Sequence, residues 1–304
     1  MERITSPLTG ADNTEFVKKI NKNEIIRGYK KYNINTSSYF KNINTISVYK
    51  CLDTGYQFFY PFNLSGDSSF YEHFQKFNWY YMPWKWEHNI TKQYLNNNMN
   101  LLEVGCAQGA FLSKISELFD FKTLVGLELN ESSPVVHDNW SILNQTVQDF
   151  SKKNKEKFDL VCSYQVLEHI ADVRSFIEAK IKCLKKGGKL IISVPNNDSY
   201  IKFSDNCLNM PPHHMGLWTE ESLKSLTKQF PLELVEVHYE DLQDYHLEHY
   251  VSATYYYKYR WRILKKIIRK INKVLGIHQK LINKINKNRQ DYIGQTILVV
   301  LEKK

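Results

Sequence analysis

The residues with the clearest chemical meaning lie in the segment Asn100–Gly109, which reads NLLEVGCAQG. An apolar run that predicts a strand leads directly into the small residues Gly105, Ala107 and Gly109, and an amphipathic helical pattern follows. Small residues at such a junction let the backbone approach a ligand closely, and the first N–H groups of the helix point at that ligand. The segment therefore predicts a ligand site at the end of a strand.

Carboxylates at matching positions indicate that this ligand contains a nucleoside. Glu103 precedes Gly105 by two residues, and Glu128 ends the next predicted strand, nineteen residues after Gly109. A carboxylate at the tip of the second strand of a doubly wound sheet is placed to bind ribose hydroxyls. Asp149, in the sequence QDF after a third strand, could accept a hydrogen bond from an adenine amino group. The alternative is that the glycines only form a tight strand–helix turn.

Three histidines are candidates for acid–base chemistry. His169 lies in VLEHI after a fourth predicted strand, and His213 and His214 lie in PPHHMGLWT after a fifth. A histidine in such a loop can take a proton from an acceptor hydroxyl near neutral pH. His214 is the preferred catalytic candidate and His213 the second. His169 is the third candidate, although a structural hydrogen bond to backbone at the start of a helix is favoured for it. The pair is too isolated to predict a metal site, so we expect no metal.

Five segments, taken in order, resemble the class I S-adenosylmethionine-dependent methyltransferases, and within them the small-molecule group of quinone-type and sugar-type enzymes. The segments are LLEVGCAQG, VGLELNES, VQDF, FDLVCSYQVLEHI and LKKGGKLIISVPN. The resemblance covers residues from about 100 to 240 and the final strand. One departure is Ala107, where the family most often has a second glycine, and we expect its methyl group to leave binding intact.

The resemblance implies S-adenosylmethionine as the cofactor and S-adenosylhomocysteine as the product. Glu128 would then bind the ribose diol, Asp149 and Phe150 the adenine edge, and Ser163–Gln165 would lie beside the amino-acid tail. The full expected cofactor set is Glu103, Gly105, Ala107, Gly109, Glu128, Leu129, Asp149, Phe150, Tyr164 and Gln165. A dinucleotide is the competing cofactor, but it fits only if two alanines replace glycines of its fingerprint.

Strands must alternate with helices to position these residues. The expected strands are 100–105, 123–129, 141–146, 158–163, 188–194, 232–239 and 294–302. The pattern predicts an α/β fold, a Rossmann-like class I methyltransferase sheet with an antiparallel last strand. We expect a small N-terminal module over 1–95 and a methyltransferase domain over 96–304, with a helical insertion at 241–290 before the last strand.

Two short segments of the N-terminal module echo each other: Ser6–Gly10 reads SPLTG and Cys51–Gly55 reads CLDTG. Zinc knuckles read C-x-x-C-G, and here Ser6, Thr9 and Thr54 stand at three of the four cysteine positions. Some sugar C-methyltransferases carry an N-terminal zinc-binding module, which this arrangement resembles in degenerate form. We therefore expect a zinc-ribbon-like pair of hairpins without metal, and two unrelated turns are the alternative.

Sixteen aromatic residues lie within residues 49–94. Most are expected to fill the seam between the N-terminal module and the sheet domain, because aromatic side chains bury large apolar areas. The alternative is that some of them wall the acceptor pocket and stack on a sugar face. The named candidates for that role are Tyr80, Tyr81, Trp84 and Trp86.

The net charge of +9 is concentrated in one segment. Twelve Lys or Arg and no Asp or Glu lie between Tyr255 and Gln290, so the other 268 residues together carry −3. Apolar residues recur there at spacings of three and four, with basic residues on the other faces. A basic amphipathic helix over 258–289 suits an anionic membrane surface. A solvated helix packed on the protein and a nucleic-acid contact are the alternatives, although no RNA-binding motif is recognisable elsewhere.

The remaining bulk features place the chain in the cytoplasm. Five scattered cysteines, no leader-like start and no long apolar run predict reduced thiols and a cytoplasmic protein, peripheral at the inner membrane face if the basic helix binds lipid. The expected activity is methyl transfer to a small polar acceptor, above all a saccharide hydroxyl in cell-surface polysaccharide (glycan) biosynthesis. The alternatives are O-methylation of a quinone or lipid-like phenol, and a non-catalytic cofactor-binding subunit.

Overall fold

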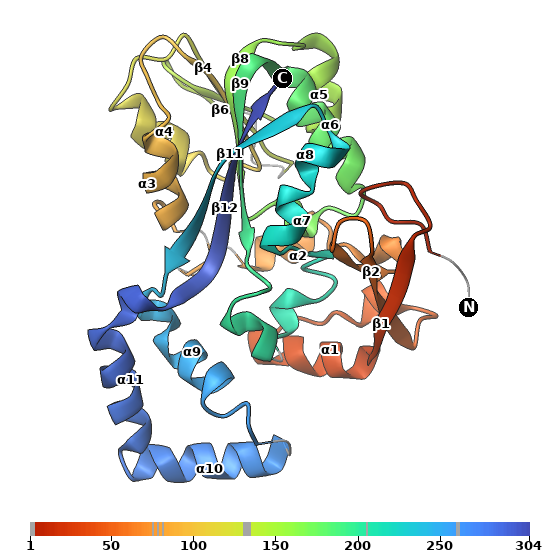
Figure 1. Ribbon diagram of the computed structural model, residues 1–304, viewed down its shortest axis with the longest axis vertical. Helices are drawn as coiled ribbons and strands as arrows, with labels where there is room; N and C mark the ends of the chain where they lie inside the picture. Colours follow the sequence, from red (N-terminus) through yellow and green to blue (C-terminus); the bar gives the residue numbers. More distant parts are fainter. Residues whose placement is uncertain are drawn as a thin grey trace.

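The computed structural model describes residues 4–74, 76–77, 79–80, 82–129, 135–204, 206–259 and 262–304. Two sheets organise this part of the chain (Figure 1). The smaller has the strand order β1-β2-β3-β10, and the larger has the order β11-β12-β9-β8-β4-β5-β7-β6. The larger sheet carries the segments that the sequence analysis singled out.

Five strands form the parallel part of the larger sheet. They are β4 (Asn100–Val104), β5 (Thr123–Leu127), β7 (Ser141–Leu143), β8 (Phe158–Tyr164) and β9 (Leu184–Pro195). At one edge, β6 (Val135–Val136) pairs antiparallel with β7. At the other, β12 (Ile293–Lys303) lies antiparallel between β9 and β11 (Leu232–Asp241). The expected α/β fold with an antiparallel last strand is confirmed.

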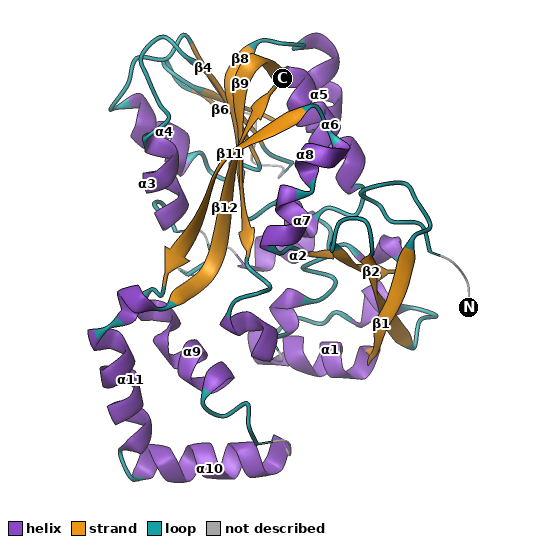
Figure 2. Cartoon of the chain, viewed as in Figure 1, coloured by secondary structure: helices purple, strands orange, loops and turns teal. Residues whose placement is uncertain are grey.

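Helices cover both faces of this sheet (Figure 2). One face packs on α3 (Trp86–Lys92) and α4 (Ala110–Ser116), and the other on four helices. These four are α5 (Val147–Lys153), α6 (Val173–Cys183), α7 (Glu220–Lys224) and α8 (Leu226–Gln229). Because successive strand residues point to opposite faces, Leu160 and Cys162 join one core while Val161 joins the other.

The smaller sheet is antiparallel and belongs mostly to the N-terminal module. Its first strands are β1 (Thr14–Asn21), β2 (Thr45–Cys51) and β3 (Gln57–Tyr60), and the module adds α1 (Lys22–Tyr29) and α2 (Ser68–Phe74). The fourth strand, β10 (Gly216–Leu217), comes from the region after residue 95, directly after the predicted histidine loop. The module and the sheet domain therefore share one hydrogen-bonded sheet.

The two knuckle-like segments adopt the same turn. Gly10 donates its N–H to the carbonyl of Ser6 at 2.9 Å, and Gly55 donates to the carbonyl of Cys51 at 2.8 Å. Both glycines have positive φ, 74° and 71°, which a residue with a side chain rarely adopts. The same backbone path in both turns supports their pairing in one motif.

The four ligand-type positions of these turns meet at the Cys51 thiol. Thr9 Oγ1 lies 3.8 Å from Cys51 Sγ. Burial acts to raise the pKa of this thiol, but hydrogen bonds from Thr54, Ser6 and Thr9 outweigh it and lower the pKa. One thiol and three hydroxyls do not make the ligand set of a structural zinc site. The relationship to a zinc ribbon stays a prediction.

The insertion before β12 is helical, as expected. It consists of α9 (Leu247–Thr254), α10 (Arg262–Val274) and α11 (Ile277–Lys287), and it projects from the end of β11 and β12 (Figure 1). No helix among the described residues has the length and apolarity that crossing a bilayer requires. All five cysteines are buried free thiols, in accord with the predicted reduced state.

Short 3₁₀ turns complete the described chain. They are η1 (Lys30–Tyr32), η2 (Ser37–Phe40), η3 (Phe62–Leu64), η4 (Leu167–His169), η5 (Tyr200–Phe203), η6 (Cys207–Asn209), η7 (Asp244–His246) and η8 (Arg289–Asp291). Four of them, η4, η5, η6 and η7, carry residues that line the candidate site, and all four lie in segments that follow strands of the larger sheet.

Candidate active site

A cavity of about 940 Å³ lies where the parallel strands of the larger sheet end. All three predicted histidines line it. Of the ten predicted cofactor residues, seven also line it, namely Glu103, Gly105, Ala107, Glu128, Leu129, Tyr164 and Gln165. Gly109, Asp149 and Phe150 do not. The carboxyl ends of parallel strands are the usual ligand-binding edge of such sheets.

The structure corrects the prediction for Asp149 and Phe150. Asp149 lies in the first turn of α5, exposed, where it accepts hydrogen bonds from Thr146 Oγ1 at 2.9 Å and Lys152 Nζ at 2.7 Å. Phe150 is buried in the core beneath the helix. The sequence signal for this was the helix-capping pair of Thr146 and Asp149. The segment 146–148 lines the cavity instead.

Gly109 is also corrected, because its small size serves packing. It precedes α4 with a φ of 75°, and a Cβ atom there would lie 2.6 Å from the ring of Trp140. Gly105 lines the cavity, and a Cβ there would lie 2.5 Å from the side chain of Val166, which also lines it. Of the two glycines, only Gly105 thus lies at the ligand cavity.

The Glu128 carboxylate is held at the tip of β5 by the loop after β4. Its Oε2 accepts a hydrogen bond from the N–H of Ala107 at 2.8 Å, and its Oε1 accepts one from the N–H of Leu129 at 2.8 Å. Ala107 and Gln165 both have positive φ, 49° and 54°. Such backbone conformations cost free energy in residues with side chains and gather at functional sites.

Three buried carboxyl groups give the cavity an acidic character. Glu87 on α3, Glu103 on β4 and Glu168 in η4 each have one side-chain oxygen with no hydrogen-bond partner among the described residues. Burial raises the pKa of all three carboxyls, to about 8 for Glu103, where Glu128 adds to the effect, and to about 8 for Glu168. Buried oxygens without partners favour a ligand that brings cationic or hydrogen-bond-donating groups.

One cationic side chain opposes this acidic group. Lys85 lines the same cavity, and its charge acts to lower the pKa of Glu87, Glu103 and Glu168. It is the single Lys or Arg among the described lining residues. Carboxyls with a pKa of about 8 are largely protonated near neutral pH, and a positively charged ligand beside them would favour their ionised form.

A chain of hydrogen bonds fixes the tautomer of His214. The side-chain amide nitrogen of Asn197 donates to the carbonyls of Pro195 and Trp218, at 3.2 and 3.1 Å. Its oxygen is therefore free to accept from the amide nitrogen of Asn209, at 2.8 Å. The Asn209 oxygen then accepts from Nδ1 of His214, at 3.0 Å. His214 thus carries its proton on Nδ1, which leaves a lone pair on Nε2.

The other two histidines also form hydrogen bonds within the protein, His213 through both ring nitrogens. His213 donates from Nδ1 to the carbonyl of Leu208 at 2.8 Å, and its Nε2 accepts from the hydroxyl of Tyr80 at 2.7 Å. His169 donates from Nδ1 to the carbonyl of His213 at 2.6 Å. These bonds give His213 and His169 positioning roles in the loop that carries His214.

Burial keeps all three rings neutral. It lowers the pKa of His169 to about 4 and the pKa values of His213 and His214 well below the usual 6.5, and the neighbouring histidines add to the effect at the latter two. A neutral ring can accept a proton, whereas an imidazolium cannot. The arrangement can therefore provide a general base at His214.

The three histidines could together hold a metal ion. One ring nitrogen from each lies within 4.8 Å of the others. The expectation of no metal considered only His213 and His214, and the structure adds His169 as a third side chain of a type that can bind metal. His213 Nε2 already bonds Tyr80, which leaves fewer nitrogens than a three-histidine site requires. The expectation of no metal stays a prediction.

Aromatic side chains form the outer wall of the cavity. Tyr80, one of the four predicted, lines it together with Tyr71 and Trp79, which the sequence analysis did not single out. Trp84 and Trp86 pack instead against the core of the larger sheet near α4. The fourth candidate, Tyr81, lies outside the described residues.

Comparison with known proteins agrees with this geometry. The family model described as "Methyltransferase domain" matches residues 79–237, just over half of the chain. The ubiquinone biosynthesis O-methyltransferase of Dictyostelium discoideum mitochondria is 31% identical over 124 residues, covering 34% of this chain and 38% of that protein. The ubiquinone biosynthesis O-methyltransferase of Bartonella tribocorum is 31% identical over 107 residues, covering 33% and 42%. The matches thus span about two fifths of these relatives.

Among solved structures, a SAM-dependent methyltransferase from Archaeoglobus fulgidus superimposes with a TM-score of 0.46 and 17% identity, covering 71% of this chain and 90% of that one. The match to the family model decides the assignment, because it spans β4, β5, β7, β8, β9 and most of β11. The chain belongs to the methyltransferase domain family, the class I enzymes that depend on S-adenosylmethionine.

Proposed function

We propose that this chain transfers the methyl group of S-adenosylmethionine to a hydroxyl oxygen of a small acceptor in the cavity. The observation that carries the proposal is the buried Glu103 carboxyl, whose Oε2 has no partner among the described residues and which lies two positions before Gly105. When bound, the donor supplies a methyl group on a positively charged sulfur and an ammonium group. Those charges suit a cavity with unpaired buried carboxyl groups.

Different residues of the chain would bind different groups of the donor. Glu103 would pair with a positive charge, and Glu128 at the tip of β5 would accept hydrogen bonds from the ribose hydroxyls. Gly105 lines the cavity, where its bare backbone would allow close approach of the donor. The segment 146–148 takes the place that Asp149 was expected to fill.

The acceptor side is supported by His214 and the aromatic wall. His214 Nε2 would remove the proton of the acceptor hydroxyl, and Tyr71, Trp79 and Tyr80 would hold an acceptor ring or sugar face. Because burial lowers the pKa of His214, it is a weak base and suits an acidic hydroxyl better than an alcohol. A phenol, with a pKa near ~10, is such a group.

We infer a phenolic acceptor of the quinone type for this reason. The names of the two curated relatives, both ubiquinone biosynthesis O-methyltransferases, point the same way. A saccharide hydroxyl in polysaccharide biosynthesis, the main expectation from the sequence, is the second candidate. It is favoured by the aromatic wall, on which a sugar face can stack.

Calorimetry tests the donor site. Glu103→Gln and Glu128→Ala should each weaken S-adenosylmethionine binding at least about tenfold, the loss of one charge-assisted hydrogen bond. Glu233→Gln on β11, an exposed residue outside the cavity, is the matched control and should bind as the wild type does. Unchanged binding in both cavity variants would contradict the donor-binding roles proposed for Glu103 and Glu128.

A labelled methyl donor tests the acceptor. Catechols and quinol precursors are incubated with the enzyme in parallel with nucleotide sugars and lipid-linked saccharides. Label in the phenols supports the proposal. Label in the saccharides alone would replace the phenol by the second candidate.

A further inference from the structure

The helical insertion turns an apolar face toward solvent. Of the eighteen large apolar side chains that are exposed in the described residues, seven lie within 263–277. They include Ile263, 75% exposed, Ile271, 51% exposed, and Val274, 80% exposed. At about 100° per residue, the exposed apolar residues of α10 fall within an arc of about 100°. A soluble helix normally directs such a stripe toward the protein core.

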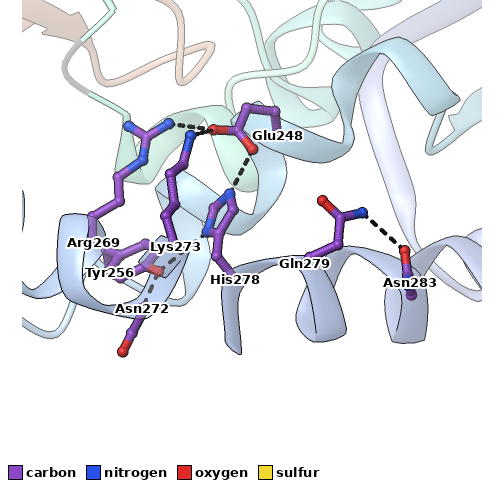
Figure 3. Close-up of polar contacts among 8 residues, drawn as sticks. All are labelled: Glu248, Tyr256, Arg269, Asn272, Lys273, His278, Gln279 and Asn283. Atoms are coloured by element: carbon purple, nitrogen blue, oxygen red, sulfur yellow. Dashed lines mark hydrogen bonds and ion pairs between the residues drawn. The ribbon is translucent and has the colours of Figure 1, made fainter. Parts of the chain in front are cut away.

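The opposite face of α10 is fixed to the protein by polar contacts (Figure 3). Glu248 on α9 accepts hydrogen bonds from Arg269 Nη2 at 2.5 Å, Lys273 Nζ at 2.8 Å and His278 Nε2 at 2.5 Å. Asn272, buried on the same side, donates to the hydroxyl of Tyr256 at 3.4 Å. These contacts hold α10 with its polar side inward, so its apolar side faces outward.

Basic side chains accompany the apolar face. Lys266 and Lys270 are exposed on α10, and Lys280, Lys284 and Lys287 are exposed on α11. The sequence from Tyr255 to Gln290 contains twelve Lys or Arg and no acidic residue. A second copy of this chain would bring two such surfaces together against electrostatic repulsion. A negatively charged membrane surface attracts the basic side chains, and its apolar interior can bury the exposed aliphatic groups.

We propose that the outward face of α10, with the start of α11, docks in the plane of a membrane that contains anionic lipids. The aliphatic residues would enter the boundary between headgroups and acyl chains, and the lysines would contact the headgroups. The proposal stands on this surface alone and does not depend on the acceptor. The insertion also reaches the cavity, since Tyr245, His246 and His249 line it. A membrane-bound insertion would therefore bring the cavity close to lipid-borne molecules.

Vesicle flotation of the full chain tests the proposal. The protein is mixed with phosphatidylcholine vesicles that contain or lack phosphatidylglycerol. We expect flotation with the anionic vesicles only, and a weaker signal at high salt. Replacing Ile267, Ile271 and Val274 together by serine should lower the partition coefficient at least tenfold. The matched control replaces three exposed apolar residues elsewhere, Leu118, Val136 and Val235, by serine, and should float as the wild type does.

A charge variant provides a second, independent readout. Lys266→Glu with Lys270→Glu should lower binding to anionic vesicles at least tenfold, whereas Lys182→Glu with Lys186→Glu, exposed on another part of the chain, should not. Circular dichroism and thermal unfolding confirm that each variant folds.

Several results would overturn the proposal. These are wild-type protein that does not float, serine variants that float like the wild type, and equal binding to neutral vesicles. Sedimentation showing a dimer that the serine substitutions dissociate would assign the face to a second copy. Retention on RNA without vesicle binding would assign it to nucleic acid.

Discussion

At the residue scale, two adjacent histidines of one loop have different chemical capacities. Both rings are buried and stack 4.5 Å apart. Among the described residues, His213 uses both ring nitrogens for hydrogen bonds, whereas His214 uses only Nδ1. At Nε2 the difference comes from Tyr80, whose hydroxyl bonds His213. Asn209, which is oriented by Asn197, accepts at the oxygen facing His214 and so keeps the proton of that ring on Nδ1. Asn209 is thus a positioning residue for the proposed base.

We expect His214→Ala to lower kcat about 100-fold or more, the contribution of a positioned general base, with little change in S-adenosylmethionine affinity. Added imidazole should restore part of the rate, since it can enter the space left by the ring. Asn209→Ala should lower kcat less and leave the acceptor KM nearly unchanged. His238→Ala on β11, outside the cavity, is the control. A His214→Ala enzyme with full activity would remove the base from the mechanism.

The pH dependence follows from the lowered pKa of His214. The ring is unprotonated above its pKa, so a pKa held well below 6.5 by burial keeps the base active as pH falls through 6.5. We therefore expect kcat at saturating S-adenosylmethionine, whose positive charge favours the ionised form of Glu103, to stay flat between pH 8 and pH 6.5, apart from ionisation of the acceptor. A loss of activity centred near pH 6.5 would indicate a solvated histidine instead.

At the scale of elements, periodicity predicted the sheet better than it predicted the site. Apolar runs separated by helical patterns identified all seven expected strands because burial on both faces leaves continuous apolar sequence. Asp149 was misplaced because a local cap at Thr146 fixes its side chain away from the cavity. The contacts of His214 with Asn209, and of Asn209 with Asn197, depend on loop packing that no periodic pattern records.

The paired turns of the N-terminal module yield a constructive prediction. Replacing Ser6, Thr9 and Thr54 by cysteine would place four thiols around the position of Cys51. Thr9 Oγ1 and Cys51 Sγ are already 3.8 Å apart, which suits two sulfur ligands about 2.3 Å from one zinc ion. We expect the triple variant to bind one Zn²⁺ per chain and to unfold at higher temperature with zinc than with a chelator. Absence of zinc in elemental analysis would contradict the shared motif.

Glu248 sets the stability of the insertion. Partial burial acts to raise its pKa, but hydrogen bonds from Lys273, His278 and Arg269 outweigh this and lower the pKa to about 2. With an unfolded value of 4.5, the stabilisation is present above pH 4.5 and is lost as pH falls toward 2. Glu248→Gln should therefore speed amide exchange in α10 and α11 at neutral pH, with a loss of about 1 kcal/mol. The difference from wild type should shrink at pH 3.

At the scale of the whole molecule, the chain has two sheets joined through one loop. The loop bearing His213 and His214 leads into β10, which pairs with β3 through Gly216 and Leu217 opposite Phe58 and Gln57. Tyr56 of the N-terminal module packs on Trp218, with ring centroids 4.3 Å apart. The loop that carries the proposed base is thus held by residues of the N-terminal module as well as by residues that follow the expected boundary near residue 95.

Deleting residues 1–60, which include β1, β2 and β3, should therefore abolish methyl transfer even with an acceptor that needs no contact with them. Exchange of the amides at 213–217 should rise at the same time, because β10 would lose its partner strand. Binding of S-adenosylmethionine should fall less, since Glu103 and Glu128 lie on the other sheet. A truncated chain with normal turnover would show that the N-terminal module is dispensable.

The pairing of β10 with β3 also sets rules for recombining this protein with its homologues. A crossover between the N-terminal module and the glycine motif would take β3 and β10 from different proteins. The hybrid would then have a mismatched strand pair next to the loop that carries His214. A transfer between homologues should instead move the N-terminal module together with residues 206–218. The transferred part then keeps its own pairing of β3 with β10.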